Sequence, residues 1–474
     1  MKTHITVLSA TLLAFTFLAC SNVTRQEIPP QEQENMAIPL DSLNPLIIAE
    51  ITRPVKPDPS FSWAPKTGSV DLGSLKNTSG KEPVLMVIGE ARAAGYRDGG
   101  LYRQGQLTSY PNLVARQMGL ANFDPGLFDK EQGNGSGYFV QDPGSTLPNW
   151  SKVTNNLAFD NDKTKQMKPY TGGMVHNISV PGNGISKYDL NLSRIYSEVI
   201  DFERTSPLPS SALTANYLWT TGLVPLALIN RIIPADKANP WAHLKEMNPD
   251  IGIIDLNTDV YTIADIAGGE NGLLGPREVV QERLAINYFR EKKAPYIYMT
   301  VPDVLDFPYF KWFTLKKLAS RTKNPIYSVW GSKSVLADNK TIFLPTINVI
   351  NVLQGNAFET LEEHDVILPS EISKPEWHND FEVAAYVREF GHPLVDFYSV
   401  YKKIIHGDYV SEDGFRIDPS YPNGNFFSSD GIHPTAIGQA VLANEVIKVL
   451  NKSYKAKIPL INVGMFAAEI EKVK

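Results

Sequence analysis

An aspartate and a histidine near the C-terminal end of the chain are the residues best placed for acid–base chemistry. Asp430 and His433 are three positions apart, so the carboxylate can reach the imidazole ring within a single turn. An imidazole oriented in this way can activate a water molecule directly, as in general-base hydrolysis. The alternative is structural, because a buried Asp–His pair can tie the last helix to a sheet without doing chemistry. The spacing alone leaves both interpretations open.

The only cysteine, Cys20, is a candidate for lipid attachment. Lys2 and His4 precede an apolar run over residues 5–19, which is too short for an ordinary membrane-spanning helix but has the length of the apolar core of a signal peptide. The sequence Phe-Leu-Ala-Cys at 17–20 resembles the lipobox of bacterial lipoproteins, where the cysteine is acylated and becomes the new N-terminus. A buried structural cysteine is the alternative. Acyl chains at Cys20 would hold the protein on a membrane surface without spanning the membrane.

The remaining histidines do not form a metal-binding pattern. They are widely separated, and neither a His-x₃-His pair nor a second cysteine accompanies them. These histidines are His176, His243, His364, His378, His392 and His406. The glycines at 182–184 and 268–269 lack the strand-GxGxxG-helix context of a dinucleotide site, so they predict turns. The sequence therefore predicts neither a metal ion nor a cofactor.

An aromatic segment near position 310 is a candidate binding surface. Tyr309, Trp312 and Phe313 belong to the sequence Tyr-Phe-Lys-Trp-Phe. Tyr, Trp and Phe are favoured as anchors in interfaces, so the segment can form an exposed binding or membrane-facing patch. The alternative is that these side chains form the core of an insertion.

From residue 83 onward, short apolar strands alternate with longer amphipathic stretches, which is typical of a parallel sheet covered by helices. The expected strands are 84–88, 175–180, 251–256, 296–301 and 393–397. The expected helices are 108–118, 187–203, 277–292 and 435–451. Thr435 can cap the last helix, in which apolar residues recur at helical spacing. We therefore expect an α/β fold.

The chain divides into three parts on composition. Residues 1–19 are the expected lipoprotein signal peptide, and residues 20–80, rich in Pro, Ser, Thr, Asn and charge, are expected to form a lipidated tether and strapping segment. Residues 81–474 are the expected folded domain. Within it, the stretches 121–172 and 302–390 fit neither strand nor helix patterns. They predict insertions at one end of the sheet, where ligands of open α/β folds bind.

The overall composition is that of a globular protein with a substantial core. Hydrophobic residues make up 43% of the chain and charged residues 20%. The formal net charge is −6, and no stripe of lysine and arginine stands out, so nucleic acid is not an expected partner. With Cys20 lipidated no disulfide can form, so stability must come from the core.

Several sequence blocks resemble those of SGNH (GDSL-type) hydrolases. Residues 84–96, Val-Leu-Met-Val-Ile-Gly-Glu-Ala-Arg-Ala-Ala-Gly-Tyr, look like the first block, in which a buried strand delivers Gly-Asp-Ser to the carboxyl edge of the sheet. Residues 426–435 contain Asp-Gly-Ile-His-Pro and look like the last block, Asp-x-x-His-Pro. The chain also resembles a lipoprotein branch of this family, found in Bacteroidetes-type bacteria, at residues 99–107, 109–112, 301–304 and 308–310. The resemblance implies a flavodoxin-like three-layer sandwich with a parallel sheet and large loop insertions.

The resemblance also indicates that the nucleophile is missing. In the family the serine hydroxyl attacks an acyl carbon, the histidine takes its proton and the aspartate orients the imidazole. Ala91 occupies the serine position, and a methyl group can neither attack a carbonyl nor donate to an oxyanion. Glu90 replaces the preceding aspartate. The Asp–His pair of the last block is retained as Asp430 and His433.

The oxyanion positions are only partly retained. The third block, Gly-x-Asn-Asp, falls on residues 256–259, so Leu256 replaces the glycine and Thr258 the oxyanion-binding asparagine. Removing one oxyanion donor typically costs about 10² to 10³ in rate. The glycine of the second block is retained as Gly182. Two independent losses predict a protein without serine hydrolase activity.

These features predict a catalytically deficient envelope lipoprotein that acts as a binding or scaffolding subunit of an outer-membrane protein assembly or transport complex. Its expected partners are the membrane, through Cys20, and an outer-membrane protein. We expect it on the outer membrane, with the periplasmic side and the cell surface both open. One alternative is an acyl or acetyl ester hydrolase that uses a relocated nucleophile or a water activated by His433. The other is a glycan or lipid receptor that uses the old substrate cleft.

Overall fold

The computed structural model describes most of the chain from Ile47 to Lys472. The described residues are 47–141, 150–161, 166–168, 170–181, 240–256, 258–259, 262, 276–322, 324–330, 333–355, 360–362, 365–369, 379 and 391–472. Cys20, Gly182 and the helix expected at 187–203 lie outside them. No helix within the described ranges is long and apolar enough to cross a membrane.

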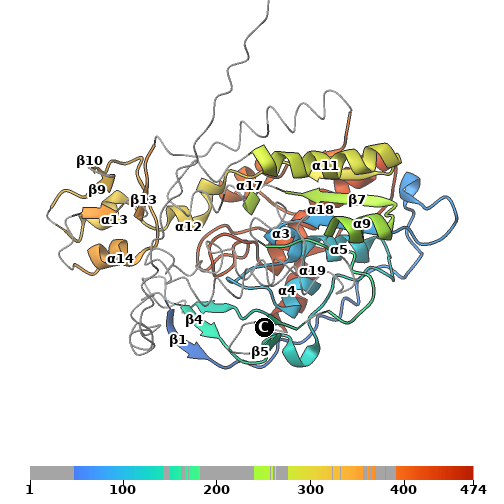
Figure 1. Ribbon diagram of the computed structural model, residues 1–474, viewed down its shortest axis with the longest axis horizontal. Helices are drawn as coiled ribbons and strands as arrows, with labels where there is room; N and C mark the ends of the chain where they lie inside the picture. Colours follow the sequence, from blue (N-terminus) through green and yellow to red (C-terminus); the bar gives the residue numbers. More distant parts are fainter. Residues whose placement is uncertain are drawn as a thin grey trace, which may run out of the picture.

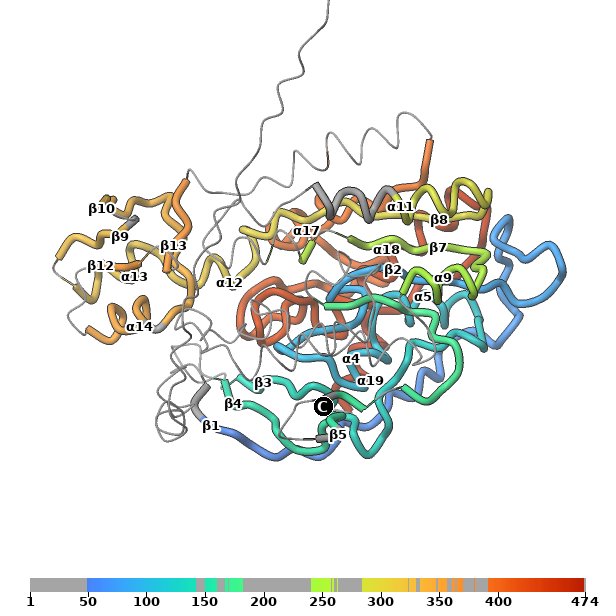
Figure 2. Tube along the Cα trace, viewed as in Figure 1, coloured from blue at the N-terminus to red at the C-terminus, as the bar shows by residue number. Residues whose placement is uncertain are grey.

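A parallel sheet forms the centre of this α/β fold (Figures 1 and 2). Its strands lie in the order β14-β8-β7-β2, and each neighbouring pair is parallel. They are β2 (Leu85–Gly89), β7 (Ile251–Asp255), β8 (Tyr296–Met299) and β14 (Leu394–Val395). Four of the five expected strands are thus confirmed, each with boundaries that differ by no more than two residues.

The fifth expected strand, 175–180, runs parallel to the free edge of β2. The Val87 N–H donates to the His176 carbonyl at 2.9 Å, and the Ile178 N–H donates to the Val87 carbonyl at 3.0 Å. Val87 and Asn177 form a parallel bridge. In chain order the strands therefore lie 2-1-3-4-5. In open α/β sheets of this order, ligands bind at the carboxyl ends of the first and third strands, which are here β2 and β7.

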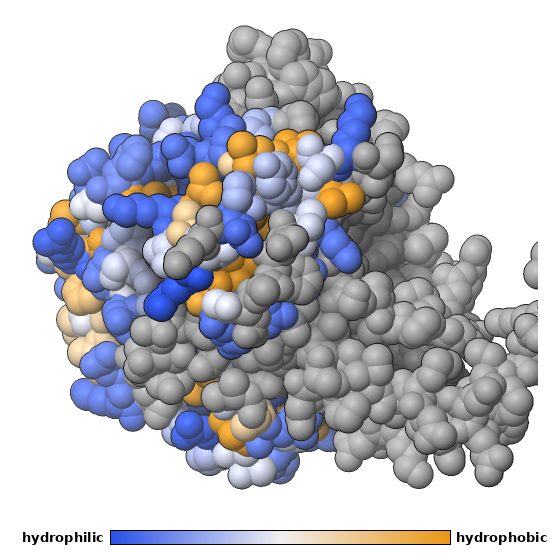
Figure 3. All heavy atoms as spheres, turned by 90° about the vertical axis from the view of Figure 1, so that its left-hand side faces the viewer, coloured by the Kyte–Doolittle hydropathy of each residue, from blue (hydrophilic) through white to orange (hydrophobic). Residues whose placement is uncertain are grey.

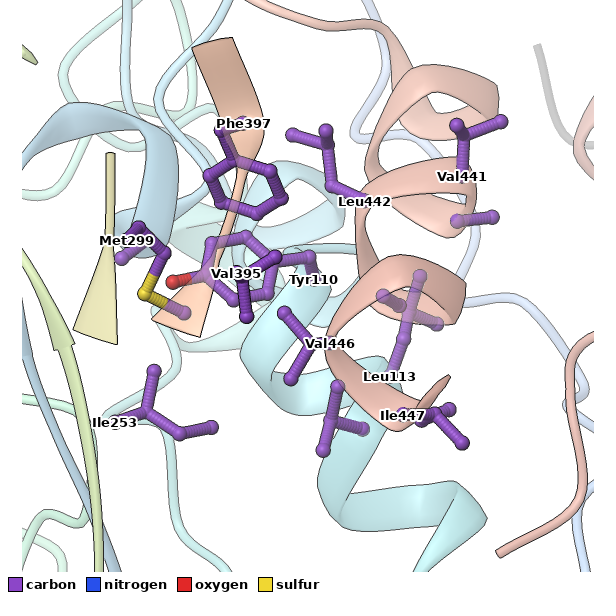
Figure 4. Packing of buried hydrophobic residues seen from close by; sticks show 14 of the residues in the cluster. Tyr110, Leu113, Ile253, Met299, Val395, Phe397, Val441, Leu442, Val446 and Ile447 are labelled. Carbon is purple, nitrogen blue, oxygen red and sulfur yellow. The ribbon is translucent and has the colours of Figure 1, made fainter. Parts of the chain in front are cut away.

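Alternate side chains of the strands enter two separate hydrophobic cores. Leu85 and Val87 belong to one core, whereas Met86 and Ile88 belong to the other. This alternation follows from the period of two in a β-strand, and both faces of the sheet are therefore apolar. Figure 4 shows the first core, where β7, β8 and β14 pack against helices from the N-terminal and C-terminal parts of the chain.

Helices cover both faces of the sheet. The first core is lined by α5 (Tyr110–Gln117), α17 (Phe397–Ile405), α18 (Ala436–Tyr454) and α19 (Val463–Glu471). The second is lined by α9 (Pro240–Met247) and α11 (Pro276–Lys292). The helices expected at 108–118, 277–292 and 435–451 correspond to α5, α11 and α18. Thr435 caps α18 as expected, because its hydroxyl accepts a hydrogen bond from the Gly438 N–H at 3.1 Å.

The segment placed in the tether is largely part of the fold. Strand β1 (Ile47–Ile51) pairs in parallel with β4 (Trp150–Val153), which pairs with β3 (Phe139–Gln141). Phe61, Leu72 and Leu75 are buried in the first core. Residues 47–80 therefore belong to the described fold, and the domain boundary expected at residue 81 is too late. We call residues 52–80 the strap.

Glu469 of α19 fixes the strap to the C-terminal end of the chain. Its carboxylate accepts hydrogen bonds from the Ser60 hydroxyl at 2.8 Å, the Phe61 N–H at 2.8 Å and the Trp63 indole N–H at 2.6 Å. Burial raises the pKa of Glu469, but these hydrogen bonds together outweigh burial and leave the pKa below its usual value.

Part of the second insertion folds as a small lobe beside the sheet, at the left of Figure 1. We call the described residues from 307 to 369 the insertion lobe. Its strands are β9 (Tyr327–Trp330), β10 (Lys333–Leu336), β11 (Ile342–Phe343), β12 (Thr360–Glu362) and β13 (Val366–Ile367). Its helices are α12 (Pro308–Lys311), α13 (Leu315–Ala319) and α14 (Ile347–Leu353). Phe139 and Trp150 of the first insertion enter the core of this lobe, so the two insertions pack together.

The remaining elements are short. They are η1 (Gly73–Leu75), α3 (Ala91–Ala94), α4 (Arg103–Leu107), η2 (Lys130–Gln132), β5 (Phe159–Asn161), β6 (Gln166–Met167) and η5 (Val304–Asp306).

Candidate functional site

The turn after β2 carries the position that resembles a nucleophile position. Gly89 ends the strand, and a Cβ there would lie 2.7 Å from the Ala93 Cβ and 2.9 Å from the Ser179 hydroxyl oxygen, so only glycine fits. Helix α3 runs from Ala91 to Ala94 and is capped by Gly95, which has a left-handed backbone with φ of 82°. Ala91 is fully buried. The methyl group therefore packs in the interior at the carboxyl edge of the sheet.

A pair of buried carboxylates joins this turn to the segment that follows β7. The Ala91 N–H donates to the Asp259 carboxylate at 2.8 Å, and the Asp259 N–H donates to the Glu90 carboxylate at 2.8 Å. Both acids are 2% exposed. We call this reciprocal pair of hydrogen bonds the carboxylate clasp.

The carboxylate clasp occupies the backbone N–H of Ala91, the residue at the position that resembles a nucleophile position. In serine hydrolases, backbone N–H groups beside the nucleophile stabilise the oxyanion of the tetrahedral intermediate. Here the Ala91 N–H already donates to a carboxylate, and a second negative charge at that place would be repelled. This position therefore lacks both the nucleophile and a free oxyanion donor.

The Asp–His pair is formed and buried. The carboxylate of Asp430 lies 2.7 Å from His433 Nδ1 and also accepts the His433 and Ile432 N–H groups at 2.9 Å each. The Gly99 N–H at 3.1 Å and the Ser428 hydroxyl at 3.0 Å complete five hydrogen bonds. The His433 ring meets the edge of Tyr96 at 5.2 Å between centroids.

The charge of Asp430 is supported by these contacts. Burial, the largest single influence, raises its pKa, while His433 and the backbone N–H groups lower it. The net effect is a pKa below the usual value, so the carboxylate is ionised at neutral pH. An ionised Asp430 with five hydrogen bonds fits a structural tie as well as it fits an orienting group.

The cavity next to His433 is small. It has a volume of about 10 Å³, and its wall includes Arg92, Thr258, Asp259 and His433. A water molecule needs about 10 to 15 Å³, so this space fits about one water and no acyl group. Two buried polar atoms in this wall, Arg92 Nη1 and the Thr258 hydroxyl, have no hydrogen-bond partner among the described residues.

Arg92 anchors the floor of this cavity through a buried ion pair. Its guanidinium binds the Asp255 carboxylate with two hydrogen bonds, of 3.0 and 2.5 Å, and the Tyr110 hydroxyl donates to the same carboxylate at 3.0 Å. The guanidinium lies over the Phe397 ring at 4.6 Å. Burial disfavours the charge of Arg92, but Asp255 more than compensates and raises the pKa of Arg92 above its usual value. The guanidinium in the cavity wall is therefore held in place by its buried ion pair with Asp255.

The aromatic segment near 310 does not form an exposed patch. Tyr309 is fully buried, Phe313 is 4% exposed and Trp312 is half-buried. Trp312 packs edge-to-face on Trp150 at 5.5 Å and on Tyr421 at 4.8 Å. The prediction of these residues as binding anchors is therefore not supported, and the alternative, a core for the insertion, agrees with their packing.

A second cavity lies beside the strap, and His433 is not in its wall. Its volume is about 520 Å³, within the usual range for small-molecule sites. On one side of this cavity, the Lys56 ammonium lies 5.2 Å from the ring centroid of Tyr102 and 5.1 Å from that of Tyr138. Asp98, whose carboxylate accepts hydrogen bonds from the Ser429 N–H and hydroxyl, lies in its wall.

Sequence reasoning found the Asp–His pair but missed its neighbours. The carboxylate clasp and the Arg92–Asp255 pair join residues more than 160 positions apart, which no local pattern reveals. One signal was available. A buried strand that ends in aspartate, as β7 does at Asp255, requires a buried partner for that charge. Within the described ranges, no group of three or more His, Cys, Asp or Glu could hold a metal ion.

Comparisons with protein-family models, with curated proteins and with solved structures found no match to this chain.

Proposed function

We propose that this chain is a catalytically deficient SGNH-fold lipoprotein of the outer membrane, which acts as a binding or scaffolding subunit of a protein assembly or transport complex. The observation that carries the loss of catalysis is the hydrogen bond from the Ala91 N–H to the Asp259 carboxylate. In this proposal, the site therefore lacks a free oxyanion donor as well as the nucleophile hydroxyl. The strand order 2-1-3-4-5 and the position of the Asp–His pair support the SGNH part of the proposal.

The ester hydrolase alternative receives less support. A water activated by His433 needs an ester carbonyl within reach, and the cavity beside this ring measures about 10 Å³. A relocated nucleophile would need a serine or threonine beside His433. Two threonines line that cavity: Thr258 is 92% buried beside Arg92 and Asp259, and Thr262 is 1% exposed and donates its hydroxyl to the Thr258 carbonyl at 2.8 Å. Neither arrangement offers a route for the substrate.

The test is ester hydrolysis by the wild type and by an Ala91→Ser variant. We expect p-nitrophenyl acetate and butyrate turnover at background for the wild type. The serine alone should recover little, because Asp259 still occupies the N–H and an oxyanion donor is typically worth about 10² to 10³ in rate. Ala93→Ser is the matched control, since it adds a hydroxyl to the same short helix away from the nucleophile position. Robust wild-type turnover that His433→Ala abolishes would establish the general-base alternative instead.

The scaffolding part of the proposal is tested in the cell. The native gene is replaced by a tagged copy, and partners are recovered under mild detergent after crosslinking. We expect one or more outer-membrane proteins to be enriched equally with the wild type and with His433→Gln, since the Asp–His pair is proposed to be structural. A His433→Gln strain that loses function while folded and bound to its partner would overturn the proposal.

A ligand receptor is the second candidate, because the 520 Å³ cavity beside the strap has the size of a small-molecule site. Val140 lies in its wall and is half-buried, so Val140→Trp should fill the space. Isothermal calorimetry with a short-chain fatty acid and with a disaccharide separates the two ligand classes. Binding that Val140→Trp removes would favour the receptor over the scaffold.

A further inference from the structure

One face of the insertion lobe presents apolar side chains to solvent. Leu336 of β10 pairs directly with Tyr327 of β9, and Val329 is two positions along β9. Directly paired residues and residues two apart share one face of a sheet, so these three side chains lie together. Ser328, which points to the other face, is 1% exposed. We call Tyr327, Val329 and Leu336 the hairpin face.

The hairpin face concentrates exposed apolar surface. Tyr327 and Val329 are each 38% exposed, and Leu336 is 57% exposed. Across the described ranges, only three other large hydrophobic side chains are as exposed, and they lie on other elements: Leu284, Val410 and Met465. Figure 3 looks onto the end of the molecule that carries the lobe and shows hydrophobic residues set among hydrophilic ones. A cluster of this kind marks an interaction surface.

The same part of the chain is strongly basic. Residues 311–340 contain seven lysine or arginine residues and one aspartate, in a chain with a formal net charge of −6. The described cations among them are all exposed: Lys311, Lys316, Lys317, Arg321, Lys333 and Lys340. They are spaced through residues 311–340 and do not form one continuous run, so no basic stripe stands out in the sequence. The fold gathers them on one small lobe.

Part of this charge is compensated, because Lys311 lies 3.6 Å from the Asp306 carboxylate. Two further carboxylates lie near the hairpin face. Asp338 accepts hydrogen bonds from the Lys340 N–H at 2.8 Å and the Thr341 N–H at 3.0 Å, so it closes its own turn. Glu362 pairs with Val329 but belongs to β12, at the opposite edge of the sheet from β10. The alternation of β10 places Lys333 on the sheet face opposite Leu336, and Lys340 follows the end of the strand, so these two cations lie along the β10 edge and not on the hairpin face itself.

The chain enters the described fold beside this lobe. Ile47 of β1 pairs with Trp150 of β4, and Trp150 packs on Trp312 of the lobe. Residues 1–46, which include the proposed lipid anchor Cys20, precede this point. An anchor at Cys20 would therefore reach the described fold on the side of the lobe, through a segment that can span at most about 90 Å.

We propose that the hairpin face docks on an anionic lipid surface, with its apolar side chains in the headgroup region and the β10 edge turned toward the lipid phosphates. Exposed tyrosine and aliphatic residues suit the membrane interface, and each nearby lysine or arginine strengthens binding to anionic lipid by about fivefold. This second membrane contact rests on the proposed envelope location. It fixes the orientation of the domain, which an anchor on a long tether alone cannot do.

The test is co-sedimentation with vesicles, using the chain from position 20 onward with Cys20→Ser so that no acyl group contributes. Vesicles of phosphatidylcholine alone are compared with vesicles that also contain phosphatidylglycerol. Two paired variants probe the surface: Tyr327→Ser with Leu336→Ser, and Lys333→Gln with Lys340→Gln. The matched controls are Val410→Ser with Met465→Ser and Lys452→Gln with Lys472→Gln, which change the same residue classes outside the lobe. Circular dichroism confirms that every variant is folded.

We expect binding to the anionic vesicles only. Each lobe pair should weaken it by about tenfold or more, and neither control pair should change it by more than about twofold. Absence of binding to both kinds of vesicle, or equal loss with the control pairs, would overturn the proposal. The ester assay and the partner recovery described above do not depend on the hairpin face, so failure here is distinct from failure of the proposed function. Recovery of an acidic protein partner that needs Leu336, without lipid binding, would reassign the face to a protein.

Discussion

At the scale of single residues, the hydrogen bonds around Ala91 bear on the proposed loss of catalysis. The Ala91 N–H donates to the Asp259 carboxylate, so a serine placed at this position would still lack a free backbone donor beside it. Arg92, in the wall of the small cavity beside His433, is held by a buried ion pair with Asp255. If the proposal is correct, one substitution cannot restore hydrolysis, and Asp430 and His433 contribute to stability.

The first residue-scale prediction concerns His433→Gln. Glutamine keeps much of the volume and some hydrogen-bonding ability, so the free energy of unfolding should fall by about 1 to 2 kcal/mol. Urea denaturation followed by tryptophan fluorescence measures the change. A loss near zero would mean that the bond from His433 to Asp430 adds nothing to stability, contrary to the structural role.

The second residue-scale prediction is that Asp430→Ala costs more than His433→Gln. Removing the carboxylate deprives five donors of their acceptor, among them the buried N–H groups of Gly99 and Ile432. Each unsatisfied buried donor costs about 1 to 3 kcal/mol, so the loss should exceed about 3 kcal/mol. The same urea titration compares the two variants. Equal losses of unfolding free energy in the two variants would show that Asp430 stabilises the fold only through its bond to the His433 imidazole.

At the scale of elements, the sheet and its helices were predictable and the strap was not. The apolar runs of β2 and β7 and the periodicity of α18 depend on local sequence, and the structure has them where expected. The strap contains many prolines and few apolar residues, which is also typical of a flexible tether. What distinguishes it is the contact of Phe61 and Trp63 with α19, and a contact across the whole chain leaves no local pattern.

The element-scale prediction is that Glu469→Gln releases the strap. Glutamine keeps one acceptor oxygen but removes the negative charge of Glu469. The free energy of unfolding should therefore fall by about 1 kcal/mol, allowing for the partial exposure of the carboxylate. Protease cleavage within residues 52–80 should become faster. Glu445→Gln serves as a control, since it neutralises a carboxylate of α18 that does not contact the strap. Unchanged cleavage in the Glu469→Gln variant would contradict the role of this carboxylate.

The pH dependence of the same contact has a definite sign. The pKa of Glu469 is lower in the folded protein than in the unfolded chain, so its contribution is complete above the unfolded value of about 4.3 and disappears as the pH falls through the lower folded value. Wild type and Glu469→Gln should therefore differ in stability at neutral pH and converge in acid. Denaturation midpoints measured from pH 7 down to pH 3 check this. A difference that grows in acid would contradict it.

At the scale of the whole molecule, the two insertions form one unit. Trp150 of the first insertion is fully buried, donates its indole N–H to the Ser429 carbonyl at 2.8 Å, and packs on Trp312 of the lobe. The composition of the insertions predicted that they lie outside the regular sheet. It could not predict that Trp150 and Trp312, more than 160 positions apart in the sequence, pack together.

The whole-molecule prediction is that Trp150→Ala separates the lobe from the domain. A buried tryptophan replaced by alanine costs about 3 to 5 kcal/mol, and the loss here should fall first on the interface. Hydrogen exchange should speed up in β3, β4 and α14 while the amides of β7 and α18 stay protected. Trp63→Ala is the comparison, because it removes an indole from the strap instead. Uniform acceleration throughout the protein would mean that the lobe has no separate stability.

The bond between the strap and α19 sets an order of events during biogenesis. Ser60 and Glu469 are 409 residues apart, so ribosomes complete the acceptor long after they complete the donors. Until α19 is complete, the Ser60 hydroxyl, the Phe61 N–H and the Trp63 indole lack their shared acceptor, although Asp58 can already bind Arg103. Closure of this part of the strap is therefore one of the last events of folding, and a chain that ends before α19 would leave these three donors without the carboxylate.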